Sequence, residues 1–148
     1  MELKLIIFFA LLSFTVAKLE IEIEGKDGWA RNLPTWRIKN KLTDLILNNA
    51  PLTGYHLWMF STIFVLLHFP FILGITWTFS WEIKLIAFFL AFITLEDFLW
   101  FVLNPAYGIR KFNKTTVTWH HIWIGPIPLF YLTNIFISIS LFSIGSII

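Results

Sequence analysis

The sequence predicts an all-α integral membrane protein, a bundle of about four transmembrane helices with a short interfacial segment between the first two. Two observations support this fold class. Hydrophobic residues make up 57% of the 148 positions and charged residues only 14%, against roughly 25% charged in average soluble proteins. The apolar residues also gather in four runs, and the last three have the ~20 residues that a helix needs to cross a bilayer. We expect residues 1–148 to form a single transmembrane domain.

The four apolar runs predict helices at approximately residues 3–19, 56–76, 83–104 and 121–147. The connection between the second and third helices is short, so these two helices are expected to be antiparallel neighbours. Trp77 and Trp81 lie in this connection, where tryptophan is typical of the membrane interface. Near the start of the last run, Pro126 and Pro128 either bend the helix or delay its start until Leu129.

The first run has two interpretations. It follows Lys4 and ends in small residues near Ala17, which is typical of a cleaved secretory signal peptide. It is also long enough to be an uncut first helix. Nine of the 11 Lys and Arg residues lie in the longer polar stretches, 18–55 and 104–120, which the positive-inside rule places in the cytoplasm. A cleaved signal would place them outside. We favour the uncut helix in a multi-pass protein of the cell membrane.

Residues 20–55 and 105–120 are the expected extramembrane segments. Apolar and acidic residues alternate over 19–24, which favours a strand; the alternative is the interfacial end of the first helix, carrying Glu20, Glu22 and Glu24. Tryptophans and basic residues then mix over 29–41, a composition that suits lipid headgroups. This segment is interpreted as a membrane-surface anchor or as a lid over a site in the mouth of the bundle.

An acidic pair, Glu96 and Asp97, interrupts the third apolar run. A charged carboxylate inside hydrocarbon costs at least ~2.5 kcal/mol, so it normally has a buried partner and a function. Because neighbouring helices are antiparallel, the end of the third helix and the starts of the second and fourth face the same side. We therefore expect His56, His120 and His121 to lie near Glu96 and Asp97 at one membrane face.

Imidazoles and carboxylates together suit a divalent metal such as zinc, iron or manganese. The expected ligands are His56, Glu96, His120 and His121, with Glu96 and Asp97 as catalytic residues. The sequence contains neither the HxxxH boxes of membrane desaturases nor the HExxH helix of zinc proteases, so neither family is supported. Cysteine is absent, which excludes disulfides, thiolate zinc sites and iron–sulfur clusters.

Metal-free acid–base chemistry is a second interpretation, because a buried carboxyl can act as a general acid. The Glu96-Asp97-Phe98 sequence resembles the acidic pairs of small carotenoid-cyclising membrane domains, over three residues of one helix. The resemblance implies that an acidic pair protonates a polyene while aromatic faces, here Phe98, Trp100 and Phe101, stabilise the cation.

A third interpretation is structural: Arg110, Lys111 or a histidine pairs with the carboxylates and holds the helices together. The sequence thus predicts a metal-assisted enzyme acting on a lipid-like substrate, with a non-catalytic membrane subunit or scaffold as the alternative. The expected partners are the lipid bilayer and a lipid-like small molecule. A net charge of +2 is too small to indicate a nucleic-acid partner. Assembly into a homo-oligomer is compatible with the sequence.

Overall fold

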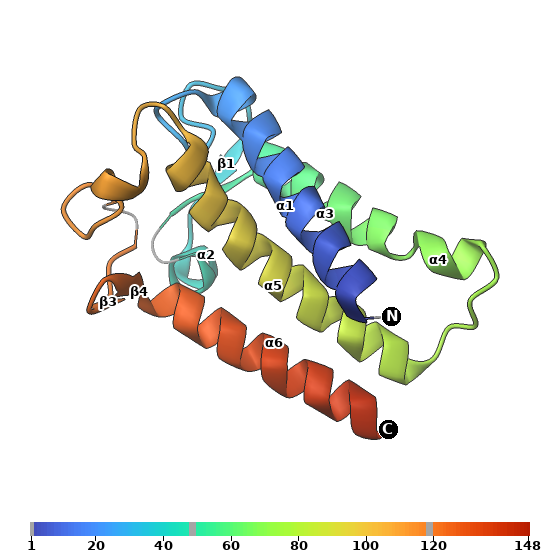
Figure 1. Ribbon diagram of the computed structural model, residues 1–148. Helices are drawn as coiled ribbons and strands as arrows, with labels where there is room; N and C mark the ends of the chain where they lie inside the picture. The colour runs from blue at the N-terminus through green and yellow to red at the C-terminus, as the bar shows by residue number, and fades with distance from the viewer. Residues whose placement is uncertain (1, 48–49, 118–119) are drawn as a thin grey trace.

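A computed structural model describes residues 2–47, 50–117 and 120–148 as a mostly helical protein (Figure 1). Its long helices run back and forth between two ends of an elongated bundle. α1 and α5 end, and α3 and α6 begin, at the same end of the bundle. The helices are α1 (Glu2–Glu24), α2 (Lys41–Ile46), α3 (Gly54–Leu67), α4 (Phe69–Ile72), α5 (Phe79–Leu103) and α6 (Leu129–Ile147).

Two pairs of short strands lie in the segments that connect the helices at that end. β1 (Arg37–Ile38) pairs antiparallel with β2 (Leu52–Thr53), and β3 (Trp123–Ile124) pairs antiparallel with β4 (Ile127–Pro128). A 3-10 turn, η1 (Ile109–Lys111), follows α5. The β3–β4 hairpin contains both prolines of the last apolar run, so α6 begins at Leu129 and not near residue 121.

α5 is the central helix, with α1 and α6 packed against it (Figure 1). Small residues allow α5 and α6 to approach closely, as is typical of helices in membranes. A Cβ atom on Gly145 would come within 2.9 Å of the Ser80 carbonyl oxygen. Further along, the hydroxyl of Ser138 donates to the carbonyl of Ala87 at 2.7 Å.

α1 continues as a helix to Glu24, so the strand interpretation of residues 19–24 is wrong. A helix satisfies its own backbone polar groups, whereas an isolated strand at the edge of a membrane leaves them unpaired. Ala17 and Ile21 are buried beside Trp100 of α5, which fixes the end of α1 against the end of α5. Gly25, at φ +67°, then ends the helix in the left-handed conformation that glycine adopts readily.

Side chains also tie these two helix ends together. The amide of Asn104 donates to the Gly25 carbonyl at 2.9 Å, and the Tyr107 hydroxyl donates to the Lys26 carbonyl at 2.9 Å. Burial, reinforced by the charge of Asp27, raises the pKa of Tyr107, so its phenol stays a hydrogen-bond donor at neutral pH. The end of α1 is therefore held in a fixed position relative to α5.

Three of the described helical segments are long and apolar enough to cross a membrane: Gly54–Ile72, Phe79–Leu103 and Leu129–Ile147. Each carries exposed apolar side chains of the kind that contact lipid, such as Val65, Ile86 and Phe136. α1 has a comparable length of 23 residues, with charged residues near both ends. Residues 118 and 119, at the end of the expected polar loop 105–120, lie outside the described residues.

Candidate functional site

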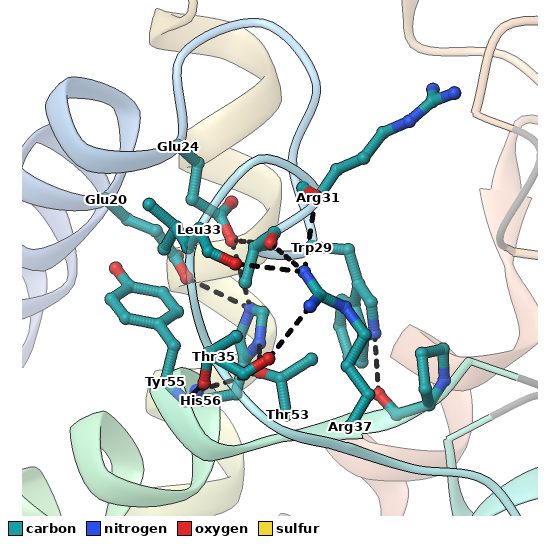
Figure 2. Close-up of polar contacts among 12 residues, drawn as sticks. Glu20, Glu24, Trp29, Arg31, Leu33, Thr35, Arg37, Thr53, Tyr55 and His56 are labelled. Carbon is teal, nitrogen blue, oxygen red and sulfur yellow. Dashed lines mark hydrogen bonds and ion pairs between the residues drawn. The ribbon is translucent and has the colours of Figure 1, made fainter.

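A buried cluster of two glutamates and one histidine lies where α1 ends and α3 begins. Glu20 and Glu24 are four residues apart and so share one face of α1. Nε2 of His56 lies 3.4 Å from Oε1 of Glu20 and 3.4 Å from Oε1 of Glu24 (Figure 2). All three side chains are at most 6% exposed. One ligand atom from each lies within 4.8 Å of the others, so the three could hold a metal ion.

Thr53 fixes the orientation of His56. Its fully buried hydroxyl caps α3 by accepting from the backbone N–H of His56 at 3.2 Å. The same hydroxyl lies 2.6 Å from Nδ1 of the imidazole. With the ring proton on Nδ1, Nε2 presents its lone pair to the space between the two glutamates. A hydrogen bond of this kind typically orients a histidine that binds a metal.

Trp29 covers the cluster from a strained turn. Its ring stacks on His56 with centroids 4.4 Å apart, and its Nε1 donates to the Pro51 carbonyl at 2.8 Å. Trp29 and Ala30 have φ angles of 49° and 51°, a region that costs a residue other than glycine ~1–3 kcal/mol. This conformation turns the N–H of Ala30 onto the carboxylate of Glu24, where it donates a short hydrogen bond. The strained backbone conformation thus positions the Trp29 ring and the Ala30 N–H against the cluster.

Arg37 holds this turn in position. Its guanidinium donates to the Thr35 carbonyl at 2.9 Å, to the Arg31 carbonyl at 3.2 Å and to the carbonyl of Ala30 (Figure 2). These bonds tie residues 30–35, next to the turn that covers the cluster, to Arg37 of β1. The two functions predicted for residues 29–41, a membrane-surface anchor and a lid over a site in the mouth of the bundle, both stay predictions.

A cavity of about 50 Å³ lies beside the cluster, between α1, α3 and α5. Glu20, Glu24, Glu96 and Asp97 line it together with His56. Its other described lining residues are aromatic, aliphatic or glycine, with no lysine or arginine among them. One water needs roughly 10–15 Å³, so the cavity has room for an ion with a small number of waters.

Glu96 is the most buried acidic side chain of this cavity, at 2% exposed. Its Oε1 atom has no hydrogen-bond partner among the described residues, and its charge lies close enough to interact with that of Glu20. Leaving a buried polar atom without a partner is unfavourable by ~1–3 kcal/mol. A cation, a proton or a water in the cavity would satisfy this oxygen.

Asp97, the next residue, has its partners already. Its Oδ2 accepts a short hydrogen bond from the hydroxyl of Tyr131 and lies 3.0 Å from Nε2 of His120. His120 is buried and stacks on Phe130, with ring centroids 5.8 Å apart. This group ties α5 to the start of α6. Oε1 of Glu96, by contrast, is buried without a hydrogen-bond partner among the described residues.

The structure divides the predicted site residues between a buried cavity and a surface groove. His56, Glu96 and Asp97 line one cavity. His120 contacts Asp97 and not His56. His121 is exposed, in a surface groove that His120 also lines, together with Lys114 and Ile122. The same end of the bundle therefore holds all five residues, as the antiparallel order of the helices predicts, although they do not form one ligand set.

Glu20 and Glu24 were not among the predicted ligands. The alternating pattern of residues 19–24 places Glu20, Glu22 and Glu24 on one face of a strand, whereas the helix turns the exposed Glu22 away from the other two. The spacing of four residues between two glutamates at a helix end is the signal that could have identified them.

In the comparisons with known proteins, no protein-family model, no curated protein and no solved structure matches this chain. The arguments for function therefore come from the geometry and chemistry of the cluster. Two features carry them, namely the convergence of Glu20, Glu24 and His56 and the buried Oε1 of Glu96, which has no hydrogen-bond partner among the described residues.

Proposed function

We propose that this protein is a multi-pass membrane enzyme that binds a divalent cation through Glu20, Glu24 and His56 and acts on a lipid-like substrate. The observation that carries the proposal is the convergence of three buried ligand atoms within 4.8 Å of one another. Carboxylate oxygens with one imidazole nitrogen suit zinc, manganese or iron.

The charges around the cavity support a cation. Four carboxylates meet one imidazole there, with no lysine or arginine among the described lining residues. Bringing like charges together away from water is unfavourable unless an opposite charge compensates. A divalent cation between Glu20, Glu24 and His56 supplies that charge, and Thr53 then serves as the partner that orients the imidazole ligand.

Three protein ligands leave coordination positions open for water or substrate, which is typical of catalytic and not of structural metal sites. The reaction class that fits best is hydrolysis of an ester, because it needs no redox partner. In this reaction Glu96, which lines the cavity, would take a proton from a water. The water oxygen bonds to the carbonyl carbon, the bond to the alkoxy oxygen breaks, and Glu96 returns the proton to that leaving oxygen. The cation supplies Lewis acidity.

The proposed enzyme crosses the membrane four times, with α1 as the additional span. At 1.5 Å per residue, the 23 residues of α1 cover about 34 Å, enough for the hydrocarbon core of a bilayer. The cluster then lies near one face of the membrane, where α1 and α5 end. The excess of Lys and Arg in the segments at that end favours the cytoplasmic face of the cell membrane.

Elemental analysis of the protein purified in mild detergent and supplied with Zn²⁺ or Mn²⁺ tests the proposal. We expect close to one metal ion per chain in the wild type and little in Glu20→Gln or His56→Gln. The matched controls are Glu22→Gln, an exposed glutamate of the same helix, and His68→Gln, which removes another histidine that contacts a glutamate. Equal metal content in all five proteins, or none in the wild type, would overturn the metal site.

A non-catalytic membrane subunit is the second candidate function. The contacts of Asp97 with His120 and Tyr131 favour it, because they join two helices and need no ligand. In that case Glu20→Gln and His56→Gln change the stability of the protein without changing its metal content. Metal-free chemistry at Glu96 instead predicts a chain without metal whose activity is lost in Glu96→Gln.

A further inference from the structure

An apolar groove opens beside the polar cavity. Its volume is about 480 Å³, and Trp29, His56 and Phe60 line both spaces. Beyond these shared residues, the walls come mainly from α3, with Leu57, Ser61, Phe64 and Val65. Leu47 and Leu52, which precede α3, and Phe89 of α5 complete them. Apart from His56 and the hydroxyl of Ser61, the described side chains of this groove are hydrocarbon or aromatic. The candidate metal ligand His56 therefore stands at the boundary between a charged space and an apolar one.

The groove follows α3 away from the cluster. Leu57, Ser61 and Val65 succeed one another four residues apart, on one face of the helix. From His56 to Val65 the helix rises about 13 Å. Val65 is 69% exposed and lies in a segment with the composition of a membrane span. The far end of the groove thus opens sideways, towards the lipid.

We propose that this groove holds an acyl chain of an ester-linked bilayer lipid, with the ester carbonyl at the His56 end. The inference rests on the proposed function and names its substrate class. A chain that enters sideways from the bilayer stays in apolar surroundings along the whole path. Its first polar group, the ester, then meets the first polar residues of the protein, at His56 and the adjoining cavity.

A second apolar groove provides an internal comparison. It has a similar volume of about 460 Å³, and lies between α1, α4 and α5 with Leu5, Phe69 and Phe88 in its walls. None of its described lining residues belongs to the polar cavity. Lipid chains can fill both grooves, but only the α3 groove would place a carbonyl beside candidate metal ligands. Continuity with the cluster, and not apolar character, selects the substrate groove.

Photocrosslinking of the full chain in phosphatidylcholine vesicles tests the proposal. One lipid probe carries a diazirine beside the ester carbonyl, and another carries it at the methyl end of the acyl chain. We expect the first probe to label residues 54–58 and the second to label residues near Val65. In the groove between α1, α4 and α5 we expect both probes to label the same residues, because no polar site fixes the position of the ester there. An even distribution of both probes along the lipid-facing side of α3 would overturn the proposal.

Ser61→Trp fills the middle of the groove, and Ile139→Trp is the matched control on an exposed position of α6. The label at residues 54–58 should fall about tenfold in Ser61→Trp and stay unchanged in Ile139→Trp, because a chain needs the volume that the new ring occupies. Metal content is measured in the same samples. Metal without ordered labelling refutes the acyl groove alone, whereas ordered labelling without metal refutes the metal-assisted reaction and with it the substrate role.

Discussion

His56 lies in the first turn of α3 and His68 directly follows its last residue, and both contact glutamate, yet their surroundings differ. Nε2 of His68 lies 3.2 Å from Glu82, with the two side chains 27% and 23% exposed. Trp77 also donates to Glu82, at 2.9 Å, and Nδ1 of His68 lies 2.7 Å from the Phe64 carbonyl, close to the break that Pro70 makes in the helix. One base therefore meets one acid, near the surface, with the remaining polar atoms partnered.

At His56 the acidic groups outnumber the basic ones. Two carboxylates face one imidazole, all of them buried, and the buried Oε1 atom of Glu96, which lines the same cavity, has no hydrogen-bond partner among the described residues. A contact between histidine and glutamate is thus not by itself a sign of function in this molecule. The sign is an excess of buried acidic groups over their partners, because such an excess is stable only with an additional positive charge or with bound protons.

The largest expected effect is stabilisation by metal. A ligand that binds only the folded state at 100 times its Kd raises the free energy of unfolding by about 2.7 kcal/mol. We expect Zn²⁺ or Mn²⁺ to stabilise the wild type and His68→Gln by this order and to leave His56→Gln unchanged, measured by thermal unfolding in detergent. Stabilisation of His56→Gln to the same extent would place the ion elsewhere.

The next effect concerns the orientation of His56. Thr53→Val removes the hydroxyl beside Nδ1, and loss of such a partner weakens metal binding about 10–100-fold. Thr53→Ser keeps the hydroxyl and should bind as the wild type does. Because Thr53 also caps α3, Thr78→Val, which removes the cap of α5, is the control for a purely structural loss. Calorimetric titration gives the affinities; equal values for Thr53→Val and Thr53→Ser would contradict an orienting role.

Alanine substitutions at two glycines that follow α1 distinguish the effect of backbone strain from the effect of packing against α5. Gly25 and Gly28 both have positive φ, so alanine is unfavourable at either position by ~1–2 kcal/mol. A Cβ on Gly28 would also come within 3.1 Å of the Trp100 ring, whereas nothing lies within 4 Å of a Cβ on Gly25. We expect the free energy of unfolding of Gly28→Ala to be ~1–3 kcal/mol lower than that of Gly25→Ala, because the added methyl group overpacks against the ring. Equal unfolding free energies would mean that the loop is not packed on α5.

The smallest effect is expected from the contacts of Asp97. Tyr131→Phe removes one hydrogen bond between α6 and α5, and such bonds in membrane proteins contribute ~0.6 kcal/mol on average. The free energy of unfolding should fall by about this amount while metal content stays unchanged. A loss of metal in Tyr131→Phe would assign Asp97 and its partners to the ion site and remove the distinction between Asp97 and Glu96.

Apolar runs and antiparallel order predict much of this architecture. The third helix, expected at 83–104, is α5 at Phe79–Leu103, and the gathering of His56, Glu96 and Asp97 at one end follows from helix direction alone. Glu20 and Glu24 were missed because the alternation of apolar and acidic residues over 19–24 is short enough to fit either a strand or a helix. The turn at Trp29 and Ala30 was also missed, since neither residue favours positive φ.

The ligation of the bound ion tests the central claim most directly. An X-ray absorption spectrum of the Zn²⁺-loaded protein reports the number and type of atoms around the metal. We predict oxygen and nitrogen neighbours at about 2.0–2.2 Å with one imidazole, and loss of that imidazole signal in His56→Gln but not in His120→Gln or His121→Gln. A spectrum with two or more imidazoles, or one that His56→Gln leaves unchanged, would contradict the assignment of the site to Glu20, Glu24 and His56.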